Sequence, residues 1–168
     1  MDNKKKSQRK TILAVVLVLA VCIAGFLVTS HWAGSMKIES QDDLVQALGQ
    51  ATMSSQPPEI LATDQLDDCQ AILFDIGDGK NNLVLLVPDF LFHSRWCYLD
   101  AVQSEPGVQT YQTTLGAGDD PETLFVVYGS GQAVTVTAGG ESQAVTPDAA
   151  GNLLKIFRFS GDVQPVLS

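Results

Sequence analysis

The sequence predicts an α+β or mainly β fold, in which an N-terminal transmembrane helix precedes one helix packed on an antiparallel sheet or a small β-sandwich. Three observations predict this fold. The run Ile12–Val28 is apolar and carries no charge. A second segment, after Ser40, repeats apolar residues at helical intervals. From Cys69 onward, short apolar runs alternate with turn residues, a pattern typical of antiparallel strands.

The length and flanks of the first apolar run indicate a membrane anchor. Each helical residue rises about 1.5 Å, so residues 11–30 cover the roughly 30 Å of a hydrocarbon core. A basic cluster lies just before the run, and the positive-inside rule keeps such clusters in the cytoplasm. Its members are Lys4, Lys5, Lys6, Arg9 and Lys10. We expect a cytoplasmic tail at 1–10, an anchor at 11–30, and a single-pass cell-membrane protein whose later residues lie outside the cytoplasm.

Two alternatives to a retained anchor stay open. A basic segment followed by an apolar run also describes a secretory signal peptide, and its cleavage would leave a secreted protein. The apolar part of such peptides is usually about 7 to 15 residues, so this run is long for one. Cys22 follows Leu19-Ala20-Val21, which partly resembles a lipoprotein lipobox, but valine before the cysteine is unusual and the apolar run continues past it.

Charge is divided unequally at the apolar run. The whole chain has a net charge of -9, whereas the tail at 1–10 carries +4, so the segment after residue 30 carries -13. Such an acidic domain repels phosphates and offers no basic stripe to neutralise them. Nucleic acid is therefore excluded as a partner.

After a connection at 31–37 we expect one extracytoplasmic β-rich domain at 38–168. It begins with a helix, because Ser40 and Asp43 have the spacing of a capping box and Leu44 and Leu48 share one face. The two prolines at 57 and 58 cannot continue that helix, which predicts a loop at 51–59.

The remaining chain predicts a series of strands separated by glycine-rich hairpin turns. The expected strands are Cys69–Ile76, Leu83–Val87, Phe90–Ala101, Val108–Leu115, Thr123–Tyr128, Ala133–Ala138 and Leu153–Phe159. The first turn, Gly77–Asn82, resembles a calcium or phosphate loop only superficially. Counted from Asp75, an EF-hand would need a glutamate at Leu86, and a Walker loop would need a glycine at Phe74. We therefore predict a hairpin turn.

The segment His93–Cys97 contains the most reactive group of side chains. A strand would place His93, Arg95 and Cys97 on one face, which predicts a binding surface at His93 and Arg95. A cysteine beside a cation and a base is also a possible nucleophile. Cys69 and Cys97 are an even pair that predicts a disulfide in an oxidising compartment, with two buried free thiols as the alternative.

The sequence contains none of the common hydrolase or metalloprotease motifs, so we expect no catalytic residues, no metal site and no cofactor. Its layout resembles small single-pass membrane-anchored proteins of Gram-positive bacteria with a β-rich ectodomain. The resemblance is carried by the tail and anchor, the strand Leu83–Val87 leading to Trp96, the strand end Val126–Gly129 and the strand Leu153–Phe159. It implies no activity.

The function we expect is therefore non-catalytic binding of a protein partner or an envelope component by a membrane-anchored extracytoplasmic domain. Two alternatives belong to other classes. One is a small extracytoplasmic enzyme, thiol-dependent through Cys97 or of another kind, and the other is a ligand-binding sensor domain.

Overall fold

The computed structural model describes residues 2–54, 56–116 and 121–168, with side chains from residue 15 onward. Within these residues, two helices precede ten strands. The helices are α1 (Asp2–Gly34) and α2 (Gln41–Thr52). The strands are β1 (Glu59–Leu66), β2 (Cys69–Asp75), β3 (Asn81–Pro88), β4 (Trp96–Ser104), β5 (Val108–Leu115), β6 (Glu122–Ser130), β7 (Val134–Ala138), β8 (Glu141–Val145), β9 (Asn152–Ser160) and β10 (Val166–Leu167).

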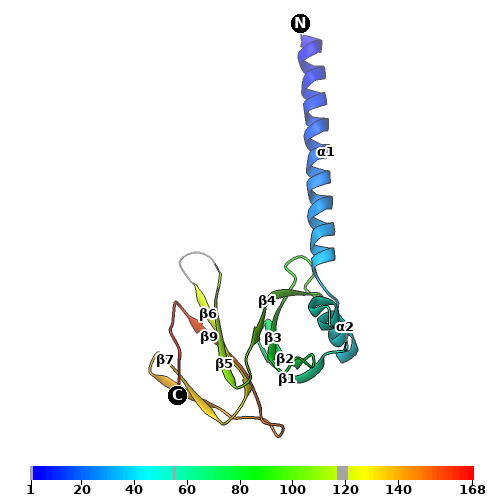
Figure 1. Ribbon diagram of the computed structural model, residues 1–168. Coiled ribbons are helices and arrows are strands. Elements are labelled where there is room, and N and C mark those ends of the chain that lie inside the picture. The colour runs from blue at the N-terminus through cyan, green and yellow to red at the C-terminus, as the bar shows by residue number, and fades with distance from the viewer. Residues whose placement is uncertain (1, 55, 117–120) are drawn as a thin grey trace.

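The strands form three antiparallel sheets that pack in layers (Figure 1). Sheet A has the order β1-β2-β3-β4, sheet B the order β5-β6-β9, and sheet C the order β10-β7-β8. One face of sheet A packs on α2, its other face packs on sheet B, and sheet B packs on sheet C. The predicted α+β or mainly β fold, with an N-terminal apolar helix, one further helix and antiparallel sheets, is confirmed.

Helix α1 extends away from the β domain as a single rod (Figure 1). Its segment Val15–Gly34 has 20 residues with a mean hydropathy of 2.2, and none of it is buried. By length and composition this segment can cross a membrane, and an N-terminal signal sequence meets the same criteria. Residues 31–34, expected in a connection, complete its last turn. The side chains of Lys4, Lys5, Lys6, Arg9 and Lys10 lie outside the described residues.

Helix α2 begins with the predicted capping box. The Ser40 hydroxyl accepts a hydrogen bond from the Asp43 backbone N–H at 3.2 Å, and the Asp43 carboxylate accepts one from the Ser40 N–H at 3.0 Å. These bonds satisfy two donors that would otherwise be unpaired at the start of the helix. Leu44 and Leu48 are buried against sheet A, so α2 is held mainly by its apolar face.

The main core lies between sheets A and B. Its members are apolar side chains from the central strands of both sheets: Cys69, Ala71, Leu73, Leu83, Leu85, Leu124, Val126, Tyr128 and Ile156. Strands β2, β3 and β6 are buried on both faces, because α2 and sheet C cover the faces that point away from this core. Two-sided burial explains why these three strands are continuous apolar runs in the sequence.

Two polar side chains form hydrogen bonds beside this core, one to the β4–β5 connection and one between sheets A and B. The buried Asn81 donates hydrogen bonds through Nδ2 to the carbonyls of Glu105 and Gly107, at 3.1 and 2.9 Å. Asp64 of β1 accepts a hydrogen bond from the backbone N–H of Ile156 in β9 at 2.8 Å. The Asp64 carboxylate thus accepts the N–H bond that the backbone carbonyl of a neighbouring strand would otherwise accept.

The structure corrects one predicted strand and adds three. Residues Phe90–Arg95, expected to belong to a strand, form a loop, and β4 begins only at Trp96. Strands β1, β8 and β10 were not predicted, because β1 and β8 are rich in polar side chains and β10 has only two residues. The turn after β2 is a hairpin turn as predicted, where the Asp75 carboxylate accepts the Gly77 N–H and the Asp78 carboxylate accepts the Lys80 N–H.

Candidate functional site

The loop between β3 and β4, residues 89–95, lies beside the C-terminal end of α1 (Figure 1). Asp89 is buried and organises this β3–β4 loop: its Oδ1 accepts the backbone N–H groups of Leu91 and Phe92 at 2.8 and 2.7 Å. The loop is closed by a hydrogen bond from the Asp89 N–H to the Arg95 carbonyl at 2.7 Å. An aspartate that accepts N–H groups two and three residues later stabilises a tight turn.

The second carboxylate oxygen of Asp89 reaches out of the loop. Its Oδ2 accepts hydrogen bonds from His31 Nδ1 at 3.0 Å and from the Cys97 thiol at 3.2 Å. Burial raises the pKa of Asp89, but the bonds from His31, the Phe92 N–H, Cys97 and the Leu91 N–H outweigh it and lower the pKa to about 2. Asp89 is therefore ionised at neutral pH, and His31 must carry a proton on Nδ1.

Arg95 caps the C-terminal end of α1. Its Nε donates to the Ser35 hydroxyl at 2.8 Å, and its Nη2 donates to the carbonyls of Trp32, at 3.3 Å, and of Ser35. The guanidinium also lies over the Trp32 ring, 4.2 Å from its centroid. The last carbonyls of a helix lack hydrogen-bond donors within the helix and carry partial negative charge. A guanidinium supplies both the donors and a positive charge.

Aromatic and backbone contacts complete the attachment. Phe90 meets the His31 ring edge-on at 5.8 Å between centroids, and Phe92 meets Trp32 at 5.3 Å. Immediately after α1, Met36 exchanges two backbone hydrogen bonds with Trp96 of β4, both 2.8 Å. We call this whole set of contacts between residues 31–36 and 89–97 the junction. It attaches α1 to the domain through polar, aromatic and backbone contacts together.

The junction does not have the geometry of a cysteine nucleophile. Burial raises the pKa of the Cys97 thiol, as do its hydrogen bond to Asp89 and the Asp89 charge, against a smaller lowering by Arg95. His31 and Cys97 both donate to the same Asp89 oxygen, so the imidazole is not bonded to the sulfur. Among the described residues, no three His, Cys, Asp or Glu side chains are placed to hold a metal ion.

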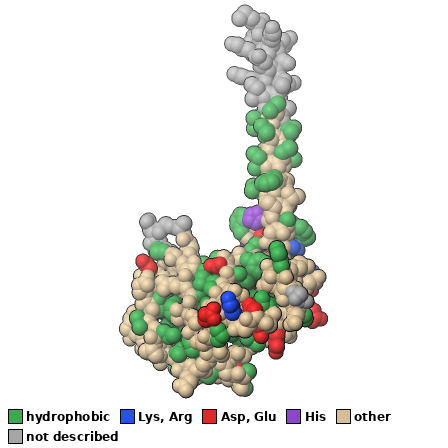
Figure 2. Space-filling model, in the orientation of Figure 1, with side chains coloured by type: hydrophobic (Ala, Val, Ile, Leu, Met, Phe, Trp, Pro, Cys, Tyr) green, Lys and Arg blue, Asp and Glu red, His purple; other side chains and the backbone are tan. Residues whose placement is uncertain are grey.

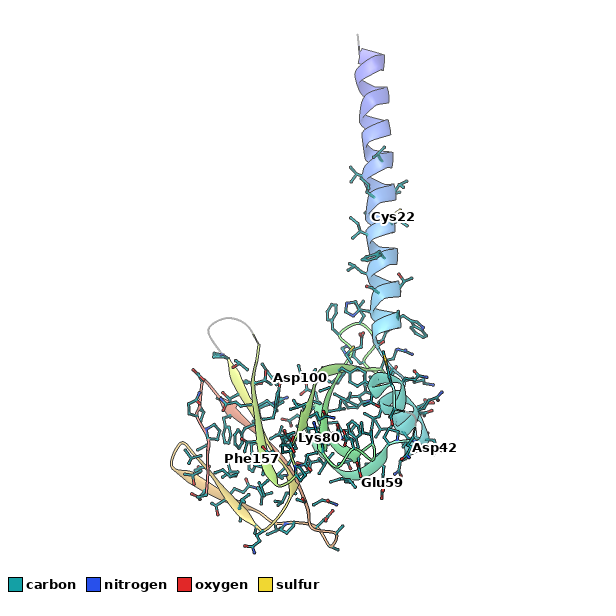
Figure 3. The ribbon with its side chains drawn as sticks, viewed as in Figure 1. Cys22, Asp42, Glu59, Lys80, Asp100 and Phe157 are labelled. Carbon is teal, nitrogen blue, oxygen red and sulfur yellow. The ribbon has the colours of Figure 1, made fainter. Side chains whose placement is uncertain are left out.

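The predicted disulfide between Cys69 and Cys97 is not formed; both are free thiols. Cys69 lies in β2 and Cys97 in β4, with β3 between them. Strands two positions apart in a sheet lie about 9.5 Å apart, whereas a disulfide needs Cα atoms within roughly 7 Å. Cys69 is a fully buried core side chain, and this burial raises its pKa to about 11. Cys22 lies on α1, away from the β domain (Figure 3).

The two residues of the predicted binding surface, His93 and Arg95, lie in different surroundings in the structure. His93 is exposed in the β3–β4 loop and does not lie on a strand, while Arg95 is turned onto the end of α1. The residues that sequence reasoning missed are Asp89 and Ser35. Their partners are 58 and 60 residues away, so no local pattern marks them. A Pro-Asp pair ending an apolar strand was the one local signal for a turn there.

A second surface feature is an open groove of about 550 Å³ beside α2. Its apolar lining comes from Ile38, Leu44, Ile60 and Trp96, and Thr63, Gln65 and Gln70 add polar groups. The groove runs between the N-terminal end of α2 and strands β1 and β2. It offers apolar contact with a few amide side chains able to donate and accept hydrogen bonds.

Comparison with protein families, with curated proteins and with solved structures found no match to this chain. The resemblance to single-pass proteins of Gram-positive bacteria therefore stays a prediction from the sequence.

Proposed function

We propose that this chain is a single-pass protein of the cell membrane whose acidic β domain lies outside the cytoplasm and binds a protein or an envelope component. The junction is the observation that carries the proposal. Arg95 caps α1, Asp89 bonds to His31, and Met36 pairs with Trp96, so the domain has one orientation relative to the helix. A fixed orientation presents the same face to every partner near the membrane, which favours binding over action on freely diffusing molecules.

The charge distribution supports the proposed topology. The basic tail before the apolar segment keeps the N-terminus in the cytoplasm under the positive-inside rule. The -13 charge of the remaining chain disfavours contact with anionic headgroups or nucleic acid. The proposed partner is therefore a protein or a neutral or basic envelope component.

Topology is tested by labelling intact cells with a membrane-impermeant maleimide. Gln143 of β8 is exposed, so Gln143→Cys should be labelled without permeabilisation. Ser7→Cys, in the basic tail, should be labelled only after permeabilisation, and the unsubstituted chain measures the background of Cys22, Cys69 and Cys97. Labelling of Ser7→Cys but not Gln143→Cys in intact cells would contradict the proposal.

Partner binding is tested by placing a photoreactive phenylalanine analogue on two exposed faces in living cells. Gln65→p-benzoylphenylalanine places the probe at the groove, and Gln143→p-benzoylphenylalanine places it on the β8 edge. A discrete covalent adduct that forms from one face and not from the other supports a specific interaction. Absence of an adduct from every exposed position tried would argue against a protein partner.

A ligand-binding sensor is the second candidate, and the groove beside α2 favours it. Its volume of about 550 Å³ is within the usual range of small-molecule sites, and its lining combines apolar side chains with amides. Native mass spectrometry of the chain extracted from its own membrane tests this candidate. A retained small molecule that Ile60→Trp displaces supports a sensor, whereas the mass of the chain alone argues against one.

The thiol-dependent alternative finds little support, because burial and Asp89 raise the pKa of Cys97 and keep it protonated. We expect Cys97 in the folded chain to react with iodoacetamide at pH 7 more slowly than a free thiol such as glutathione. The intact mass without reductant should correspond to three free thiols, Cys22, Cys69 and Cys97. Alkylation of Cys97 faster than glutathione would revive the enzyme hypothesis.

A further inference from the structure

The tip of the β3–β4 loop exposes two adjacent large apolar side chains. Phe90 is 74% exposed and Leu91 is 40% exposed. Single exposed apolar residues are ordinary on protein surfaces, but neighbouring ones at the tip of an ordered loop mark a contact surface. Hydrophobic side chains accordingly gather at the foot of the helix (Figure 2).

The apolar tip is held in place by the loop beneath it. Asp89 accepts the N–H groups of Leu91 and Phe92, and Arg95 closes the loop through its backbone. Those bonds hold the backbone of the tip in place while Phe90 and Leu91 remain exposed. Their exposure is a property of the ordered loop.

The loop lies beside the C-terminal end of the apolar segment of α1. Phe90 and Phe92 contact His31 and Trp32, which belong to the last turn of the 20-residue segment Val15–Gly34. Trp32 is itself 57% exposed. Tryptophan is enriched where membrane proteins cross from hydrocarbon to headgroups, so the loop tip reaches the same depth.

We infer that the β3–β4 loop is a second membrane contact, in which Phe90 and Leu91 enter the interfacial region of the lipid bilayer beside α1. This inference rests on the proposed membrane anchoring of α1. Insertion is apolar, because the loop's guanidinium, Arg95, is engaged by Ser35 and Trp32, and its carboxylate, Asp89, is buried. No exposed carboxylate in residues 89–95 opposes entry of the tip into the interface.

A second contact would restrict the orientation of the domain relative to the bilayer. The junction fixes the domain to α1, but a single helix can still tilt and rotate in the bilayer together with its domain, whereas a helix and a loop together restrict that tilt and rotation. Sheet C and the C-terminus, which lie at the end of the domain away from α1, then point away from the membrane (Figure 1). The inference thus specifies which surface is free to meet a partner.

The test is lipid photocrosslinking of the full chain reconstituted in phosphatidylcholine nanodiscs. The photoreactive analogue is placed by Phe90→p-benzoylphenylalanine at the loop tip. Trp32→p-benzoylphenylalanine on α1 is the positive control, and Val166→p-benzoylphenylalanine, an exposed apolar position in β10, is the negative control. We expect lipid adducts at positions 90 and 32, with a yield on the order of tenfold above that at position 166.

Each other outcome overturns a defined part of the argument. Adducts at position 32 but not at 90 would overturn the loop contact while leaving the anchor intact. Absence of adducts at both positions would overturn the membrane anchoring itself. Adducts at position 90 that appear only when phosphatidylglycerol is added would overturn apolar insertion, because they would require attraction to anionic headgroups.

Discussion

The interface between sheets A and B and the junction at the end of α1 are built from different chemistry. The first buries nine apolar side chains, among them Leu85 and Val126 with no exposed surface. The second relies on the Arg95 guanidinium and the Asp89 carboxylate, and its aromatic members Trp32 and Phe90 are more than half exposed. The first interface therefore determines whether the domain folds, whereas the second determines how the domain is oriented relative to α1.

The largest expected effect is at Gly129 in the sheet interface. Its φ is +114°, and an added Cβ would lie 2.0 Å from the Gly107 carbonyl oxygen and 2.7 Å from Asn81 Nδ2. Gly129→Ala should therefore lower the free energy of unfolding by about 3–5 kcal/mol. Urea unfolding of the full chain in mild detergent, followed by tryptophan fluorescence, measures it.

Gly139→Ala is the matched control for the same measurement. Gly139 also has a positive φ, +59°, but an added Cβ would meet nothing within 4 Å. Only the backbone conformation is then strained, which costs about 1 kcal/mol. Equal losses at positions 129 and 139 would show that the close approach of Gly129 to Gly107 and Asn81 contributes nothing.

The next effect concerns the polar bond within the same interface. Asp64→Ala leaves the buried Ile156 N–H without its acceptor, which should cost about 2 kcal/mol of unfolding free energy. Asp64→Asn keeps an acceptor oxygen and loses only the partly exposed ion pair with Lys155, so it should cost less than about 1 kcal/mol. If both variants lose the same stability in urea unfolding, the ion pair and not the N–H bond joins β1 to β9.

A smaller change in stability but a local change in dynamics is expected at the junction. Arg95→Ala removes the cap of α1 and should lower the free energy of unfolding by only about 1 kcal/mol. Amide hydrogen exchange should nevertheless become faster in residues 31–38, where Met36 pairs with Trp96, while β6 and β9 keep their protection.

Arg158→Ala is the control for that exchange measurement. Arg158 bonds to Asp68 at 2.6 Å and pairs with Asp67 and Glu122, so its loss should affect the turn after β1 and leave residues 31–38 unchanged. Arg95→Lys keeps the positive charge but lacks the planar fork, and it should recover only part of the protection. Faster exchange throughout the domain in Arg95→Ala would show that the junction is part of the folding core.

The last prediction concerns the dependence of stability on acid. The pKa of Asp89 is about 2 in the folded chain, against 3.8 for an ordinary aspartate. Its contribution to stability is therefore complete above pH 3.8 and is lost as the pH falls toward 2. Asp89→Asn, whose amide nitrogen cannot accept from His31 or Cys97, should melt below the unsubstituted chain at pH 7, and the difference should shrink below pH 3.8.

Comparing each variant with the unsubstituted chain at every pH removes the contributions of other acids. The pKa values of Asp43, Asp68 and Asp148 are also lowered in the folded chain. Protonation of these aspartates in acid therefore also lowers the stability of the chain. Asp43→Asn, at the start of α2, controls for an aspartate outside the junction. A difference between Asp89→Asn and the unsubstituted chain that stays constant from pH 7 to pH 2 would contradict the role of the ionised carboxylate.

Local patterns accounted for much of the fold. The strands at 69–75, 81–88, 108–115, 122–130, 134–138 and 152–160 lie where strands were predicted, from apolar or alternating segments between turn residues. The Ser40 and Asp43 capping box was readable from its spacing alone. The loop at 90–95 was misread as strand because Phe90, Leu91 and Phe92 are as apolar as a buried strand, although two of them are exposed. Strand β8 was not predicted because its first four residues are exposed and most of them are polar.

The apolar helix, the start of α2 and most strands can be predicted from the sequence, because each depends on residues within a few positions of one another. Three other features become visible only in the folded chain: His31 bonds to Asp89, Arg95 caps α1, and β3 separates Cys69 from Cys97. Those contacts depend on strand order and on how the loop after β3 lies against a helix about 60 residues earlier in the chain. The physical reason is that packing of whole elements, and not local spacing, brings distant polar groups within bonding distance.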